Sequence, residues 1–225
     1  MELRFFEIYR NPEYLWLLAE GVGMSAGLTL AGATLGFMLA VGLALSRFER
    51  VPVLRWVAAA WVDFIRNTPL IVQLFFVAFG LPLLLGYVWP FWAHAVLALT
   101  INFSAYFAEI LRAGFQTVDQ GQKEAAQALG VGRFTRFVRI VLPQSIAQMF
   151  ASLNSQFIFL FLTTGVISEI GVRDLTFAGL YIDSRTFRSF EVYISLTVLY
   201  ILLSLAFKAL MQVIEVRAFR WKTAR

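Results

Sequence analysis

The residues whose types and spacing best support a function lie in one polar stretch between two long apolar runs, Glu124 to Pro143. Just before it, Asp119 can cap a helix, and Gln122 stands three residues later, where it can bond back to the cap. The run from Glu124 to Leu129 consists of good helix formers, and Gly130 tolerates the positive φ at which helices commonly end. The pattern predicts a helix of about three turns. Its Ala/Leu face is typical of a small element that fills a groove on a partner.

A second helical run follows a turn at Gly130–Gly132. Arg133, Arg136 and Arg139 recur at every third position of it, and Pro143 bends the chain or starts the next segment. We therefore treat residues 119–143 as one loop, in which a short Ala-rich helix is followed by a basic helical run.

Polar side chains inside the apolar runs form a second set of candidates. Such groups are expensive in a membrane unless they line a cavity or pair with one another. The candidates for a polar path are Asn102, Glu109, Gln156, Thr163 and Thr164. Glu109 can instead pair with Arg112 three residues on, and the neutral groups can instead make interhelical hydrogen bonds.

The sequence does not contain the residues that three kinds of functional site require. Nucleotide hydrolysis needs a glycine-rich loop ending in Gly-Lys-Ser/Thr, and none of the lysines Lys123, Lys208 and Lys222 stands in one. His94 is the only histidine, so a multi-histidine metal site cannot form, and packing is the simpler role for it. No serine stands in a Gly-x-Ser-x-Gly elbow. We expect no catalytic residue, no metal ligand and no cofactor in this chain.

The composition indicates a membrane protein. The 225 residues are 60% hydrophobic with a mean hydropathy of +0.73, above the share of a soluble domain. The net charge of +5 comes from basic residues beside apolar runs, which favours membrane orientation over nucleic acid binding. The absence of cysteine excludes disulfides and thiolate metal sites.

The apolar runs predict about five transmembrane helices in one all-α domain covering residues 1–225. Their expected ranges are 20–46, 69–85, 91–115, 145–170 and 192–213. Trp56–Arg66 is a further apolar segment, ended by Asn67-Thr68-Pro69, in which Asp63 and Arg66 can pair. The polar stretch Gly171–Glu191 is expected to connect the last two spans.

The distribution of basic residues predicts the orientation. Of the 19 lysines and arginines, 14 fall on the side that holds the polar loop. These are Arg47, Arg50, Arg55, Arg66, Arg112, Lys123, Arg133, Arg136, Arg139, Lys208, Arg217, Arg220, Lys222 and Arg225, against Arg4, Arg10, Arg173, Arg185 and Arg188 on the other side. Because basic residues concentrate on the cytoplasmic side, we expect the loop and the C-terminus inside and the N-terminus outside.

The loop also carries a resemblance. The spacing of Glu124, Ala125, Ala126, Gly130, Ile140, Leu142 and Pro143 resembles the signature EAA loop of the membrane permease subunits of ATP-binding-cassette importers. Two further stretches, 66–75 and 105–112, resemble the branch that imports polar amino acids. Residues 162–165 depart from that branch, in which a lysine is common, so the cargo stays open.

The resemblance implies a fold, a set of partners and a location. It implies a type I importer membrane domain in a bacterial-type inner membrane, with Glu124, Ala125, Ala126, Leu129 and Gly130 contacting a cytoplasmic ATPase subunit that holds ATP and Mg²⁺. It further implies a second permease subunit, identical or related, an extracytoplasmic solute-binding protein and a polar amino acid as cargo. The alternatives are another small polar solute such as an opine and, with less support, a passive channel or a membrane enzyme.

Overall fold

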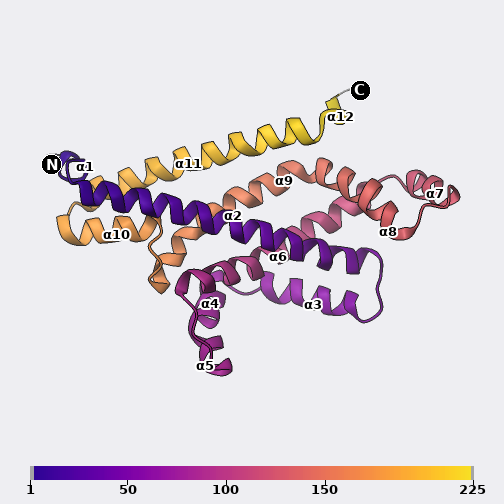
Figure 1. Ribbon diagram of the computed structural model, residues 1–225, viewed down its shortest axis with the longest axis horizontal. Coiled ribbons are helices and arrows are strands. Elements are labelled where there is room, and N and C mark those ends of the chain that lie inside the picture. The colour runs from indigo at the N-terminus through magenta and orange to yellow at the C-terminus, as the bar shows by residue number, and fades with distance from the viewer. Residues whose placement is uncertain (1–2, 224–225) are drawn as a thin grey trace. The chain divides into compact units, whose positions relative to one another are not determined.

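The computed structural model describes residues 3–223, and these residues form helices and connections with no strand (Figure 1). The long helices are α2 (Pro12–Phe48), α3 (Leu54–Arg66), α6 (Phe91–Thr117), α9 (Leu142–Thr163), α10 (Leu175–Thr186) and α11 (Ser189–Ala218). The short ones are α1 (Phe6–Tyr9), α4 (Leu70–Phe75), α5 (Leu81–Leu85), α7 (Gln120–Ala128), α8 (Arg133–Arg136) and α12 (Arg220–Thr223). The predicted all-α class is confirmed.

Among the described residues, four helical stretches are long and apolar enough to cross a membrane. They are Pro12–Phe48, Phe91–Thr117, Arg133–Ile170 and Ser189–Ala218. The broken pair Leu54–Arg66 and Leu70–Leu85 makes a fifth if it counts as one span. The prediction of about five spans is therefore confirmed, although the first begins at Pro12 rather than at residue 20.

The break between α3 and α4 has a local cause at Asn67-Thr68-Pro69. The Asn67 side chain donates to the Asp63 carbonyl at 2.7 Å, and the Thr68 hydroxyl donates to the Phe64 carbonyl at 3.1 Å. These bonds satisfy carbonyls at the end of α3, while Pro69 takes an extended conformation with ψ 139°. The predicted helix end is confirmed.

The predicted ion pair between Asp63 and Arg66 is wrong. The Arg66 guanidinium lies over the ring of Tyr106, 5.6 Å from its centroid. An aromatic face lets the cation stay partly solvated while its stem packs on the protein.

Two prolines within helical stretches are each preceded by a π-helical turn. The turn Phe76–Gly80 precedes Pro82, and the turn Phe137–Val141 precedes Pro143. In each case the residue just before the proline donates its N–H to the carbonyl five residues back, Leu81 to Phe76 and Leu142 to Phe137. Proline cannot donate this bond and its ring crowds the preceding turn, so widening the helix keeps the chain continuous. Pro143 thus lies at the start of α9, as the sequence predicts.

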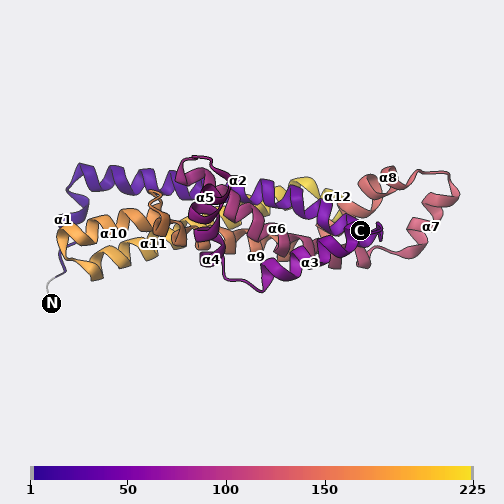
Figure 2. The ribbon, with the colours of Figure 1, turned by 90° about the horizontal axis from the view of Figure 1, so that it is seen from below.

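The chain divides into two compact units. The first comprises residues 1–34, 69–100 and 157–208, and the second comprises residues 35–68, 101–156 and 209–225. In the first unit, α10 packs against the start of α2 and of α11, and Figures 1 and 2 both place these helices side by side. The core there consists of Ile8, Leu18, Leu175, Ala178, Ile182, Val192 and Leu196.

Helix α10 corrects the expectation of a polar connection at Gly171–Glu191. Asp174 caps the helix by accepting the Phe177 N–H at 2.8 Å. Leu175, Ala178 and Ile182 follow at helical spacing, and all three are buried. The charged residues of the stretch masked this apolar face in the sequence.

The second unit is built around aromatic contacts between helix ends. The Phe115 ring of α6 lies 5.4 Å from Phe48 at the end of α2 and 5.2 Å from Phe137 before α9. Both contacts are edge-on, the arrangement that aromatic rings prefer. They bring the end of α2 next to the chain that enters and leaves the polar loop.

Candidate functional site

The short helix of the polar loop is α7, and its start follows the sequence prediction only in part. The Asp119 carboxylate accepts the Gly121 N–H at 2.8 Å, so the predicted cap is confirmed. Gln122 accepts a hydrogen bond from Gln144 at 2.7 Å, so its side chain ties α7 to the base of α9 instead of bonding back to the cap.

The end of α7 is a Schellman motif. The Val131 N–H donates to the Ala126 carbonyl and the Gly130 N–H to the Gln127 carbonyl, both at 3.0 Å. Gly130 takes φ +74°, as its position in the sequence predicts. A side chain in this left-handed conformation would be strained, so the motif needs glycine to hold the turn rigidly.

Helix α7 has a buried side and an exposed side. Ala126 is buried against the protein, whereas Glu124, Ala125 and Leu129 are exposed. Leu129 is 82% exposed at the tip, although a leucine gains by burial. The loop therefore presents an apolar tip on a helix whose start is capped by Asp119 and whose end is closed by the Schellman motif.

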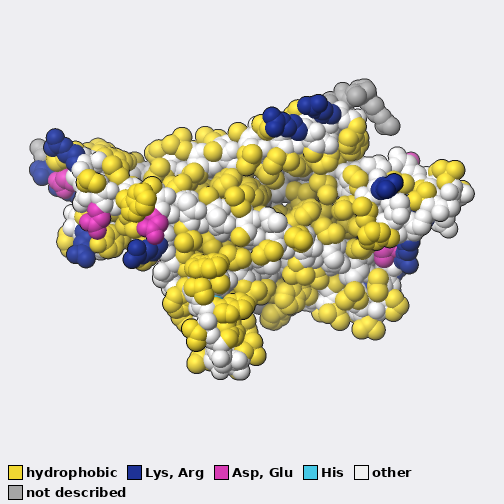
Figure 3. Space-filling view, in the orientation of Figure 1, with side chains coloured by type: hydrophobic (Ala, Val, Ile, Leu, Met, Phe, Trp, Pro, Cys, Tyr) yellow, Lys and Arg dark blue, Asp and Glu magenta, His cyan; other side chains and the backbone are white. Residues whose placement is uncertain are grey.

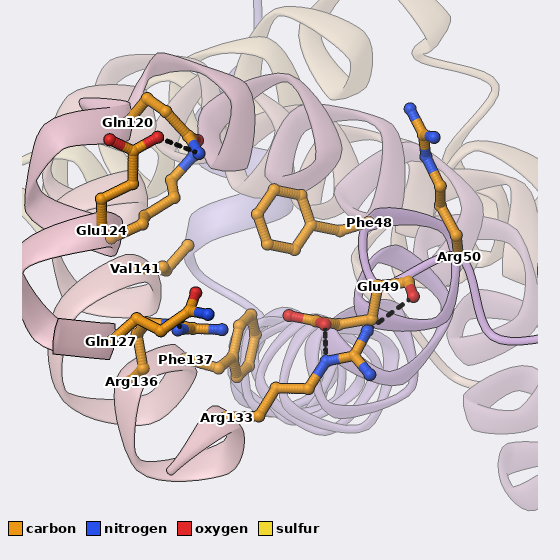
Figure 4. Close-up of a pocket in the computed structure, with 11 residues that line it drawn as sticks. Phe48, Glu49, Arg50, Gln120, Glu124, Gln127, Arg133, Arg136, Phe137 and Val141 are labelled. Carbon is orange, nitrogen blue, oxygen red and sulfur yellow. Dashed lines mark hydrogen bonds and ion pairs between the residues drawn. The ribbon is translucent and has the colours of Figure 1, made fainter. Parts of the chain in front are cut away.

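Polar contacts connect α7 and α8 to the end of α2 (Figure 4). Arg133 pairs with the Glu49 carboxylate and also donates to the Glu49 carbonyl at 2.8 Å. Arg136 donates to the Gln127 side chain at 3.2 Å. The Lys123 ammonium lies 5.3 Å from the centroid of the Phe48 ring. These contacts join α7 and α8 to the end of α2.

These residues surround a cavity of 280 Å³ between the end of α2, α7 and the turn before α9. Glu124 lines it and accepts a hydrogen bond from Gln120 at 3.1 Å. Its cationic residues Arg50, Lys123, Arg133 and Arg136 outnumber its acidic residues Glu49 and Glu124. The residues at this site can hold an element in place, but they include no nucleophile with an adjacent base.

Glu109 forms the ion pair that the sequence left open. Its carboxylate accepts from Arg112 Nε at 2.9 Å and from Arg47 Nη1 at 2.8 Å. The pair with Arg112 is confirmed, and Arg47, from the end of α2, joins it from 62 residues away. Glu109 is thus engaged as a link between α2 and α6.

The neutral candidates for a polar path differ in their surroundings. Thr163 and Thr164 donate to carbonyls of their own helix, those of Phe159 and Phe161. Asn102 is buried, and the Gln156 side-chain nitrogen is buried with no hydrogen-bond partner among residues 3–223. Asn102, Glu109 and Gln156 belong to the second unit, and the two threonines to the first.

His94 is a packing residue, as the sequence indicates. Its ring is buried and stacked on Tyr87, with centroids 5.7 Å apart. No group of three or more His, Cys, Asp or Glu residues that could hold a metal ion occurs among residues 3–223.

Glu49 and Arg47 are the site residues that the sequence did not single out. Arg47 enters the sequence analysis only in the count of basic residues, and Glu49 does not enter it. Their partners lie 84 and 62 residues further along the chain. No local pattern reports such a contact, because it depends on which helix ends the fold brings together.

The helical spans and the exposed loop have the architecture of a membrane permease subunit. Residues 32–220 match the family described as the binding-protein-dependent transport system inner membrane component, and the chain belongs to this family. It has the type I fold of the membrane subunits of ATP-binding-cassette importers.

Three curated relatives place the chain more closely. It is 36% identical over 189 residues to the L-cystine transport system permease protein TcyL of Bacillus subtilis, covering 81% of this chain and 79% of that one. It is 34% identical over 218 residues to the octopine permease OccM of Rhizobium radiobacter, covering 91% and 89%. It is 33% identical over 195 residues to the arginine permease ArtQ of Bacillus subtilis, covering 86% and 88%.

Two solved structures have the same fold. A chain of an amino acid ABC transporter crystallised with histidines matches with a TM-score of 0.83 and 35% identity, over 96% of this chain and 100% of that one. A chain of the MetNI methionine ABC transporter matches with a TM-score of 0.79 at 18% identity, over 92% and 99%. The second likeness concerns the fold alone.

Proposed function

We propose that this chain is the membrane-spanning permease subunit of an importer that carries a polar amino acid inward, driven by ATP hydrolysis on a separate subunit. The observation that carries the proposal is α7, a short helix fixed at both ends whose Leu129 tip is 82% exposed. The cystine and arginine permeases among the relatives support an amino acid as the cargo.

In this proposal α7 is the coupling helix. Glu124, Ala125, Ala126, Leu129 and Gly130 form the element that fits a groove on the ATPase, which supplies ATP and Mg²⁺. Leu129 enters the groove, while Ala126 and Gly130 hold the helix in shape from behind. The ion pair between Arg133 and Glu49 passes the motion of α7 to α2, and the π-helical turn before Pro143 passes it to α9.

Transport then proceeds by alternating access. The whole chain acts as one permease domain beside a second permease subunit, and ATP binding favours one arrangement of the spans over the other. An extracytoplasmic binding protein delivers the cargo. Gln156, whose side-chain nitrogen is buried without a hydrogen-bond partner among residues 3–223, is the strongest candidate for the polar path, because the hydroxyls of Thr163 and Thr164 already bond to backbone carbonyls. Asn102, which is buried, remains a candidate beside it.

The first test is reconstitution of the permease with its ATPase and binding protein in liposomes. A screen of cystine, arginine, glutamine, histidine and octopine should identify a solute that raises ATP hydrolysis and accumulates inside. Accumulation that needs no ATP would contradict the proposal, because a passive channel would account for it.

The second test changes the tip of the coupling helix. Leu129→Asp should lower ATPase affinity and uptake by about tenfold or more, because it puts a charge into the centre of an apolar contact. Val88→Asp is the matched control, since Val88 is 96% exposed on the connection before α6. Full uptake by the Leu129 variant would exclude α7 as the coupling element.

A further inference from the structure

A second cavity adjoins the one that α7 helps to form, and no role described above uses it. This apolar cavity has a volume of 310 Å³, and its lining residues are Leu45, Glu49, Val51, Arg133, Phe134 and Phe137. Glu49, Arg133 and Phe137 also line the cavity of 280 Å³ beside α7, which we call the charged cavity. The two are adjacent parts of one site, which lies entirely within the second unit.

The charged cavity keeps an excess of positive charge after its internal pairs are counted. Figure 4 shows that Arg133 is paired with Glu49 and that Glu124 is hydrogen-bonded to the neutral Gln120. The lining cations without a carboxylate partner among residues 3–223 are Arg50, Lys123 and Arg136. Three cations therefore remain against the single carboxylate of Glu124, and the cavity attracts an anion.

The apolar cavity lies where α2 leaves the apolar part of the chain. Leu45 belongs to the predicted span 20–46, and the charged run from Arg47 to Arg50 follows it directly. On the other side of the cavity, Phe134 is 75% exposed, so its ring is open to an occupant. A phospholipid changes from hydrocarbon chain to charged headgroup at this same boundary.

The start of α3 indicates the same depth in the membrane. Val53, Leu54 and Trp56 are 73%, 50% and 67% exposed, and Figure 3 shows a largely hydrophobic surface over α3. The Arg55 guanidinium lies 5.0 Å from the centroid of the Trp56 ring. An exposed tryptophan beside basic residues is typical of the boundary between headgroups and acyl chains. Val51, two residues before this segment, lines the apolar cavity, so the cavity is at the level of the lipids themselves.

We infer that the two cavities together bind an anionic phospholipid, with its phosphate in the charged cavity and part of an acyl chain in the apolar cavity. A free phosphate ion would pair with the cations but leave the apolar cavity unfilled. A zwitterionic lipid would bring its own ammonium group among the cations, so a lipid with a net negative charge fits better. The bound lipid contacts both the end of α2 and α7, whatever the cargo of the chain.

The test measures which lipids stay bound to the purified full chain. The chain is extracted into a mild detergent and mixed with equal amounts of phosphatidylglycerol and phosphatidylcholine, and the bound lipids are identified by native mass spectrometry. The natural chain should retain phosphatidylglycerol in preference to phosphatidylcholine. Arg50→Gln combined with Lys123→Gln should lower this retention about tenfold or more, because each cation adds to the attraction for an anionic lipid.

Arg139→Gln combined with Arg217→Gln is the matched control. Both residues are exposed and line neither cavity, so this variant loses the same charge and should keep the lipid. Phe134→Asn tests the apolar cavity and should lower the retention severalfold, because it removes apolar area from the site. Thermal unfolding in the same detergent shows whether each variant is folded, and Arg50→Gln alone repeats the test if the double variant is not.

Three outcomes would overturn the inference. The first is an equal loss of phosphatidylglycerol from the two double variants, because binding would then follow net charge alone. The second is the absence of any preference over phosphatidylcholine in the natural chain. The third is displacement of the lipid by inorganic phosphate together with unchanged retention by the Phe134 variant, which would identify a free anion as the ligand.

Discussion

At Asp174, burial and helix capping have opposite effects on the pKa of one carboxyl group. Its carboxyl group is fully buried, one oxygen accepts the Phe177 N–H, and the other has no partner among residues 3–223. Burial raises the pKa of Asp174 from 3.8 to about 7, against the lowering effect of backbone N–H groups at the start of α10. The folded state therefore holds a proton on Asp174 more tightly than the unfolded chain does.

This difference predicts a pH dependence of stability. Because the folded pKa lies above the unfolded one, the contribution of Asp174 is fully present below about pH 4, is lost as the pH rises to about 7, and is constant above that. Asp174→Asn keeps the cap and removes the titration. Its stability relative to wild type should rise by about 2 to 3 kcal/mol between pH 5 and pH 8.

The measurement is thermal unfolding in detergent at both pH values. Asp119→Asn controls for replacing an aspartate cap as such, because Asp119 caps α7 on the exposed loop. An unchanged difference between wild type and the Asp174 variant across this range would contradict the burial argument.

A substitution at Glu109 distinguishes a structural role of this residue from a contact with the cargo. Glu109→Gln leaves Arg47 and Arg112 without a carboxylate partner in a half-buried site, so unfolding in detergent should become easier by about 1 to 3 kcal/mol. The matched control is Glu7→Gln, which removes the carboxylate from an ion pair of similar exposure with Arg188. If uptake falls while stability stays at the wild-type level, Glu109 contacts the cargo and the structural role is wrong.

At the scale of elements, the close approach of α10 to α11 depends on glycine. A Cβ on Gly179 would lie 2.2 Å from Leu196 Cδ1 and 2.9 Å from its Cγ, so the whole leucine side chain would have to move. Gly179→Ala should therefore lower stability by about 1 to 3 kcal/mol, although alanine favours a helix. Gly27→Ala is the control, since nothing lies within 4 Å of its Cβ position, and unfolding temperatures decide between them.

The elements also show which parts of the fold can be predicted from the sequence. The break at Asn67–Pro69, the cap at Asp119 and the turn at Gly130 follow from residues that act on their own backbone, and all three are confirmed. Helix α10 was missed because its charged residues outweighed a buried face of only three side chains. The Glu49–Arg133 pair was missed because a contact between distant helix ends leaves no local pattern.

At the scale of the whole molecule, the positions of the charges predict which side each loop faces. The residues on the basic side include Arg133 and Arg136 around α7. Arg225, which was counted with them, lies outside the described residues. The basic majority predicts that α7 is cytoplasmic, where an ATPase can reach it, and that the connection after α10 faces outward.

Cysteine labelling in intact cells tests this orientation, because the natural chain gives no background. Leu129 is 82% exposed at the tip of α7, and Phe187 is 86% exposed after α10, so a thiol at either position is open to reagent. A maleimide that cannot cross the membrane should label Phe187→Cys in intact cells and Leu129→Cys only after the cells are opened. Labelling of Leu129→Cys in intact cells would put the coupling helix on the side without ATP. No ATP-driven motion could then enter the spans through α7, whatever the cargo.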